Sequence, residues 1–181
     1  VIECTADFFF HADPTDFGTF AGEEWFAFIE VEDASGGYDF ETSIGQDVAT
    51  LRAIDVEGAI DYGALPVASD TGANNASTTI ENLGNIAVDV LIEGSDMTDG
   101  SGSIIPSTEQ KFATSTFTYS LCGAGCALLS STSPIELDVE LTKPVSEAPP
   151  VADEVYWGIA IPIGTNSAPH QGLNTFTPVD P

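Results

Sequence analysis

The sequence predicts an all-β chain of stacked antiparallel sheets, with Greek-key connections in its larger part. Its hydrophobic residues, 43% of the 181, come mostly as short alternating runs rich in Val, Ile and Phe, the pattern of half-buried strands. Residues that favour turns, namely Gly, Asn, Asp, Ser and Pro, separate these runs. No segment has a convincing helical pattern. An all-β fold follows from these observations.

The first 47 residues predict an N-terminal β segment. Three alternating runs form its strands, at 3–10, 24–32 and 38–44. In the second run, apolar side chains such as Phe28 and Ile29 fall on opposite faces. Two glycines within 33–37 supply the positive φ that a hairpin connection needs. Three strands do not complete a two-layer domain, so this segment is expected to pack on the rest of the chain or on a neighbour.

Residues 48–181 predict a self-sufficient β-sandwich. Eight short strands at regular spacing favour two packed sheets with Greek-key connections. The expected strands are 49–56, 60–62, 77–81, 87–92, 116–120, 135–141, 155–161 and 173–177. The segment 143–152 contains three prolines, which are incompatible with a central strand, so it is expected to be a long surface connection.

Two stretches carry a family resemblance. Residues 60–67 read IDYGALPV and residues 77–90 read STTIENLGNIAVDV. They resemble the immunoglobulin-like domains related to abnormal-spindle and choice-of-anchor repeats, and later stretches resemble large predicted surface proteins of bacteria. The resemblance implies an immunoglobulin-like Greek-key sandwich that serves as a structural module, without shared catalytic chemistry. Independently, Asn and Gly within 82–85 tolerate left-handed backbone, which predicts a tight hairpin there.

The charge balance is extreme. The chain has 29 acidic residues against Arg52, Lys111 and Lys143, for a formal charge of -26. Three scattered cations cannot form a phosphate-binding patch, so no nucleic acid partner is expected. Repulsion between copies means that close assembly needs divalent cations, high ionic strength or both. The competing interpretation is a salt-adapted or simply very soluble surface.

The cysteines predict one disulfide and an oxidising location. Cys122 and Cys126 flank Gly-Ala-Gly, which can turn tightly enough to close a small loop. A zinc site is the alternative, but two thiols without a nearby His supply only half of the usual ligands. A disulfide predicts an extracellular or cell-surface protein. Cys4 is expected to be a buried thiol or to pair with another chain or a removed segment.

Nothing in the sequence predicts an enzyme. His11 and His170 are the only histidines, and neither lies in a G-x-S-x-G or H-E-x-x-H motif. The acidic residues are so numerous that close carboxylate pairs arise by chance. No Gly-rich phosphate loop or dinucleotide fingerprint is present. The sequence also lacks an apolar run near the roughly 20 residues of a membrane span, so no membrane insertion is expected.

Calcium is the most credible ligand, and no cofactor is expected to be required. Asp96 and Asp99 surround a flexible turn that could add carbonyl oxygens, while Asp13 and Asp16 form a second acidic patch that could bridge subunits. The alternative for both is a set of solvated carboxylates. Asn75 begins an Asn-Ala-Ser sequon in a polar loop, which predicts a glycosylation site unless the match is random.

These features favour a structural role. The chain is expected to be a repeating subunit of an extracellular filament, pilus-like fibre or surface layer, joined to copies of itself by β-strand addition. The apolar run of Phe8, Phe9 and Phe10 is the candidate intersubunit strand. The alternative is a carbohydrate- or surface-binding module of a larger adhesin, with surface glycans as partners.

Overall fold

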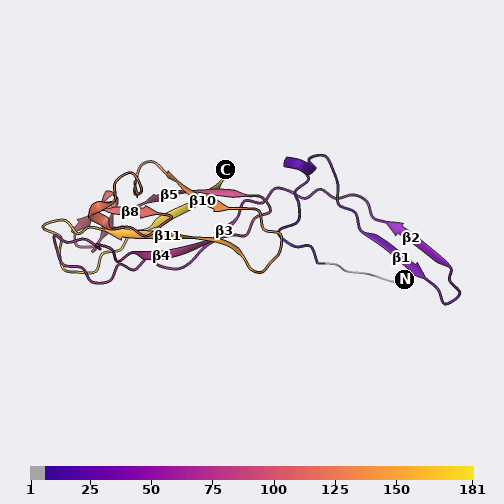
Figure 1. The fold of residues 1–181 in the computed structure, drawn as a ribbon, viewed down its shortest axis with the longest axis horizontal. Coiled ribbons are helices and arrows are strands. Elements are labelled where there is room, and N and C mark those ends of the chain that lie inside the picture. Colours follow the sequence, from indigo (N-terminus) through magenta and orange to yellow (C-terminus); the bar gives the residue numbers. More distant parts are fainter. Residues whose placement is uncertain (1–6) are drawn as a thin grey trace.

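A body and a projecting arm make up the chain in the computed structural model, which describes residues 7–181. The body comprises residues 51–181, and the arm, residues 7–50, extends from one end of it (Figure 1). The far part of the arm is an antiparallel hairpin of β1 (Phe28–Glu32) and β2 (Tyr38–Thr42). The all-β prediction is confirmed, because the described helices are only three-residue turns of 3₁₀ type, η1 (Gly18–Phe20), η2 (Ser107–Glu109) and η3 (Tyr119–Leu121).

Two antiparallel sheets form the body. The larger has five strands in the order β3 (Ile54–Val56), β4 (Ala76–Asn82), β11 (Val151–Ile159), β8 (Gln110–Ala113) and β9 (Ala127–Leu128). The smaller has three strands in the order β10 (Ile135–Leu141), β5 (Val88–Gly94) and β12 (Asn174–Val179). A short hairpin of β6 (Met97–Thr98) and β7 (Ile104–Ile105) follows β5. Because each sheet carries apolar side chains on one face, the two sheets share one core.

The core is built by strict alternation. In β5, every second residue from Val88 to Gly94 is buried, and these side chains meet those of β4, β8 and β11 in one cluster. Trp157 is the largest buried side chain, at 0% exposure, and its ring lies 5.4 Å from that of Phe112 and 6.0 Å from that of Phe176. Its indole N–H donates to Thr78 Oγ1 at 2.8 Å, which satisfies the one polar group the ring carries into the core.

The connection at 82–85 is a corner between the sheets. The prediction of a tight hairpin there is wrong, because β4 belongs to the five-stranded sheet and β5 to the three-stranded one. Asn82 and Asn85 are both buried, and the Asn82 amide donates to the carbonyls of Ile86 and Thr142 at 2.8 and 3.0 Å. A side chain on Gly84 would collide with the Leu51 carbonyl. The motif therefore specifies a buried polar turn.

Most predicted strands of the body are present. The runs at 77–81, 87–92, 135–141, 155–161 and 173–177 correspond to β4, β5, β10, β11 and β12. The strands predicted at 60–62 and 116–120 are wrong, and that at 49–56 is reduced to β3. β6, β7, β8 and β9 were not predicted, since strands of two to four residues are defined by their pairing partners and carry little alternation of their own.

Three further predictions are decided by the structure. Cys122 and Cys126 form the predicted disulfide, with Cα atoms 5.8 Å apart. The proline-rich segment is a surface connection up to Pro150, but β11 begins at Val151 and is a central strand. This is possible because Pro149 and Pro150 precede the first paired residue. Among residues 7–181, no helix is long and apolar enough to cross a bilayer.

Candidate functional site: a projecting hairpin and an open groove

The arm hairpin has one aromatic face. Directly opposed residues of an antiparallel pair lie on the same face, and the register sets Glu30 opposite Phe40 and Phe28 opposite Thr42. Phe28, Tyr38 and Phe40 therefore share a face, on which they are 59%, 70% and 59% exposed. The rings of Phe28 and Phe40 lie 5.7 Å apart. No described residue of the body covers this face (Figure 1).

The opposite face of the hairpin also carries exposed apolar side chains. Ile29 and Val31 are 41% and 45% exposed there, and each lies directly opposite a carboxylate of β2, Glu41 and Asp39 respectively. Each fully buried side chain of this kind would gain roughly 1.5–3 kcal/mol. In addition, β1 and β2 pair only with each other among the described strands. The hairpin thus presents unburied apolar side chains together with two unpaired strand edges, the combination that invites strand pairing.

A carboxylate closes the tip of the hairpin. Asp33 accepts hydrogen bonds from the backbone N–H groups of Ser35 and Gly37 at 2.8 and 2.9 Å. These bonds, that of Gly37 most of all, hold the pKa of Asp33 below its ordinary value. Gly36 has a φ of 81°, as the predicted turn requires. The hairpin therefore has a specified shape although no residue of the body, within the described part of the chain, packs against it (Figure 1).

Hydrogen bonds tie the base of the arm together. The Thr15 N–H donates to the Val48 carbonyl at 2.8 Å, and the Val48 N–H donates back to Thr15 Oγ1 at 2.8 Å. Thr15 is 4% exposed. Trp25 and Gln46 form an isolated antiparallel bridge between this base and the hairpin. Backbone hydrogen bonds thus join the two sides of the arm at its base and again where the hairpin begins.

Two contacts fix the arm to the body. Asn85, in the corner between the sheets, accepts from the Leu51 N–H at 2.7 Å and donates to the Ala49 carbonyl at 3.0 Å. On the other side of the joint, Lys143 Nζ lies 3.1 Å from Asp13 and donates to the His11 carbonyl at 2.8 Å. The motif that carried the family resemblance therefore also positions the arm.

Phe8, Phe9 and Phe10 lie at the base of the arm. The part of their predicted strand within 7–10 is wrong, since these residues have no strand pairing and Phe10 enters a turn; residues 3–6 lie outside the described part. Phe8 packs edge-on against Trp25 at 5.6 Å between ring centroids, and Phe9 stacks on His11 at 5.5 Å. Aromatic packing within the chain replaces extended pairing here. Their role between subunits stays a prediction, and so does the state of Cys4.

The predicted calcium ligands are hydrogen-bonded within the fold and lie in separate places. Asp99 accepts from Ser101 Oγ and from Asn166 Nδ2 at 2.6 and 3.1 Å, and these donors hold its pKa well below the ordinary range. Asp96 accepts from the Ser107 N–H at 2.7 Å. No group of three or more His, Cys, Asp or Glu side chains converges on a metal position within residues 7–181. Calcium binding stays a prediction.

The second acidic patch behaves in the same way. Asp16 accepts from the hydroxyl and the N–H of Thr50 at 2.7 and 2.8 Å, and the hydroxyl contributes most to lowering the pKa of Asp16. Asp13 is paired with Lys143. Asp16 thus links two segments of the arm, and Asp13 joins the arm to the body.

The predicted glycosylation site is partly buried. Asn75 Oδ1 accepts from the Phe117 N–H at 2.9 Å, and Nδ2 faces the Trp157 carbonyl at 3.4 Å. A glycan on Nδ2 would have to replace the second contact. Glycosylation of Asn75 stays a prediction.

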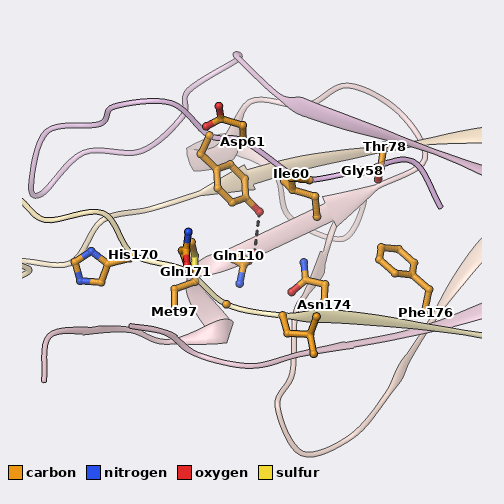
Figure 2. A pocket seen from close by; sticks show the side chains of 14 residues that line it. Gly58, Ile60, Asp61, Thr78, Met97, Gln110, His170, Gln171, Asn174 and Phe176 are labelled. Atoms are coloured by element: carbon orange, nitrogen blue, oxygen red, sulfur yellow. Dashed lines mark hydrogen bonds between the residues drawn. The ribbon is translucent and has the colours of Figure 1, made fainter. Parts of the chain in front are cut away.

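An open groove lies between the edges of the two sheets. On one side is β12 with residues 170–173 before it, and on the other is the segment 58–62 that follows β3. The groove consists of two adjoining hollows of about 530 and 550 Å³, which share Ile60, Tyr62 and Met97. Figure 2 shows the first hollow, with His170 at one end and Phe176 at the other.

The floor of the groove holds an unsatisfied amide. Gln110 is 3% exposed, and its Oε1 accepts from the Tyr62 hydroxyl at 2.9 Å (Figure 2). Its Nε2 has no hydrogen-bond partner among the residues that the structure describes, which costs about 1–3 kcal/mol in a buried position. Burial raises the pKa of Tyr62 above its ordinary value, so its hydroxyl remains a donor. The groove therefore offers one buried N–H donor to an incoming acceptor.

Sequence reasoning did not predict this groove. Tyr62 lies in the family-like stretch at 60–67, but Gln110 and Phe176 come from distant strands. His170, singled out only as a histidine, lines the groove with Nδ1 bonded to the Ala168 carbonyl at 2.8 Å. The one available signal was the alternating run at 60–62, which predicts a strand but has no strand pairing in the described part of the chain.

Comparison with known proteins does not extend these observations. No protein family, curated protein or solved structure matches the chain significantly.

Proposed function

We propose that the chain is a non-enzymatic structural subunit of an extracellular filament, pilus-like fibre or surface layer, assembled by β-strand addition between copies. The single observation that carries this proposal is the β1–β2 hairpin, which exposes apolar side chains on both faces, pairs only with itself among the described strands and projects from the body (Figure 1). A hairpin alone is marginally stable in water. Burial in a neighbour would cover its apolar faces and pair its edges.

We also propose an immunoglobulin-like Greek-key sandwich for the body. In support, β3 and β4 are neighbours in one sheet and β5 lies in the other, as the first three strands do in that fold. The later strands depart from the usual order, because β5 is central in the smaller sheet and β11 lies beside β4. The proposed fold is therefore a variant of the usual order, in which β11 pairs with β4 in the larger sheet and β10 pairs with β5 in the smaller one.

An extracellular location fits the disulfide of Cys122 and Cys126. The charge of -26 sets the conditions for assembly. Each of the three cations already has an internal partner: Arg52 binds Asp180, Lys143 binds Asp13, and Lys111 donates to the Tyr119 carbonyl. Ion pairs between copies are thus scarce, and assembly requires screening salt or divalent cations such as calcium.

The test is the assembly state of the full chain. Sedimentation velocity and electron microscopy are carried out at low and at about 1 M salt, where the Debye length falls to about 3 Å, each with and without calcium. We expect monomers at low salt and polymers under screening conditions. The double variant Phe28→Ser and Phe40→Ser should remain monomeric. A control variant, Leu121→Ser, removes an apolar side chain that is 82% exposed on the body and should polymerise.

Monomers at every salt and calcium concentration would contradict the proposal. So would polymers formed equally well by the double variant and by the Leu121→Ser control.

A further inference from the structure

The groove is bordered on both sides by unpaired backbone. β12 pairs only with β5, so its other edge is open, and it contains Pro178, a residue tolerated at sheet edges because it has no N–H to donate. Across the groove, no backbone hydrogen bond joins residues 58–62 to any residue in the described part of the chain. Either border can hydrogen-bond the free edge of an added strand.

The lining of the groove suits the side chains of a strand. Most of it is apolar, contributed by Ile60, Met97, Ile105, Ile161 and Phe176. The two hollows adjoin each other, and side chains two residues apart on one face of a strand are about 6.6 Å apart. Two neighbouring bulky side chains can therefore enter neighbouring hollows. At the floor, the Gln110 Nε2–H can donate to an acceptor on the added segment.

We propose that this groove is the acceptor site for the arm of a second copy of the chain, with strand β2 lying along the groove and pairing with one of its borders through the edge that β1 leaves free. Tyr38 and Phe40 are two residues apart, share a face and are exposed. They enter the two hollows. The proposal rests on the proposed function and specifies which surface receives the arm.

Charge permits this docking. Asp61 is the only carboxylate among the residues that line the two hollows. On β2, Asp39 and Glu41 lie on the face opposite to Tyr38 and Phe40, whereas Glu30 and Glu32 of β1 share the aromatic face. Insertion of the aromatic face therefore leaves Asp39 and Glu41 outside the hollows, and the approach of Glu30 and Glu32 to Asp61 requires the same screening salt as assembly.

The geometry makes the contact intermolecular. The arm leaves one end of the body, while the gold loop after β11, which lines the second hollow, lies at the opposite end (Figure 1). The arm of a chain therefore points away from its own groove. A contact between unlike surfaces at opposite ends repeats from copy to copy and builds an open filament.

Cysteine cross-linking tests the pairing directly. In a Cys4→Ser background, isotope-labelled Thr42→Cys protein, which has its thiol on the aromatic face of β2 and keeps Tyr38 and Phe40, is mixed with unlabelled Ala59→Cys protein under screening salt, oxidised and analysed by mass spectrometry. Ala59 is exposed at the rim of the groove. We expect the mixed disulfide to form at least about tenfold faster than with Ala73→Cys, an exposed control outside the groove, because docking raises the local thiol concentration. Equal rates would overturn the proposal.

A blocked groove provides the second test. Ala59→Glu places a negative charge at the rim beside Asp61, whereas Ala73→Glu adds the same charge elsewhere. We expect Ala59→Glu to weaken assembly about tenfold or more, since docking of an acidic arm would then desolvate an unpaired carboxylate, and Ala73→Glu to assemble as the parent does. Circular dichroism and thermal unfolding of both variants show that the body is folded.

The failure of this inference is distinguishable from failure of the proposed function. Polymers that require Phe28 and Phe40 but tolerate Ala59→Glu would retain the proposed function and show that arms pair with arms or with another surface. A groove that binds a soluble glycan, with assembly unaffected by Ala59→Glu, would also overturn the inference. The absence of any polymer would contradict both.

Discussion

The arm hairpin and the strands of the body have the same sequence alternation but opposite environments. β5 buries every second residue from Val88 to Gly94, whereas all five residues of β1 are exposed. β1 is followed by a defined turn and β5 is preceded by a defined corner, and each strand pairs with its neighbour in regular register. The difference is that β5 faces a second sheet and β1 faces water (Figure 1). Alternation therefore specifies a strand with an apolar face, and another element must supply the cover.

The largest expected effect is in the body. Trp157→Ala should lower the free energy of unfolding by about 3–5 kcal/mol, because it leaves a cavity beside Phe112 and Phe176 and removes the bond to Thr78. Urea unfolding followed by circular dichroism measures it. A loss below about 1 kcal/mol would show that the body does not depend on this core.

The corner between the sheets should have an intermediate effect. Asn82→Ala removes an amide that donates to the carbonyls of Ile86 and Thr142, and leaving buried carbonyls unsatisfied should cost about 1–3 kcal/mol in unfolding free energy. Asn74→Ala, at an exposed turn position, is the matched control. Equal stability of the two variants in urea would contradict the structural role of the corner.

The arm should contribute little to the stability of the monomer. Phe40→Ser is expected to change the unfolding free energy of the body by no more than about 0.5 kcal/mol, since the ring is largely exposed and its aromatic partner, Phe28, belongs to the same hairpin. The measurement is urea unfolding at low salt. A larger loss of unfolding free energy would show that the hairpin packs on the body, and the contrast between an exposed arm and a buried core would then be wrong.

The smallest expected effect is a pH response confined to the hairpin tip. The pKa of Asp33 is lowered by the N–H groups of Gly37 and Ser35, so its stabilising bonds are fully present above the ordinary Asp pKa of about 3.9 and are lost as the pH falls through the lower, folded value. Over that range, amide hydrogen exchange at these two residues should accelerate relative to the rate of an unstructured peptide at the same pH. Asp33→Asn keeps an acceptor that does not titrate, so its exchange should show no such transition.

The sequence determined the local elements. The turn at 33–37, the alternation of β4, β5, β10, β11 and β12, and the Cys122–Cys126 disulfide depend on neighbouring residues, so they could be predicted. The site could be predicted only in part. The alternation predicts an incomplete sheet in the N-terminal segment, but it does not show whether the apolar run at Phe8–Phe10 or the β1–β2 hairpin is left exposed, because alternation does not reveal which apolar residues are covered within the chain.

Tertiary structure alone decided the rest. It placed β4 and β5 in different sheets, because the buried amides of Asn82 and Asn85 bond to segments distant in sequence. It also left residues 58–62 without a backbone hydrogen-bond partner in the described part of the chain, and it brought Gln110 and Phe176 to the same groove. Each of these outcomes depends on which strands meet across the core, and that is a property of the whole chain, which no local pattern carries.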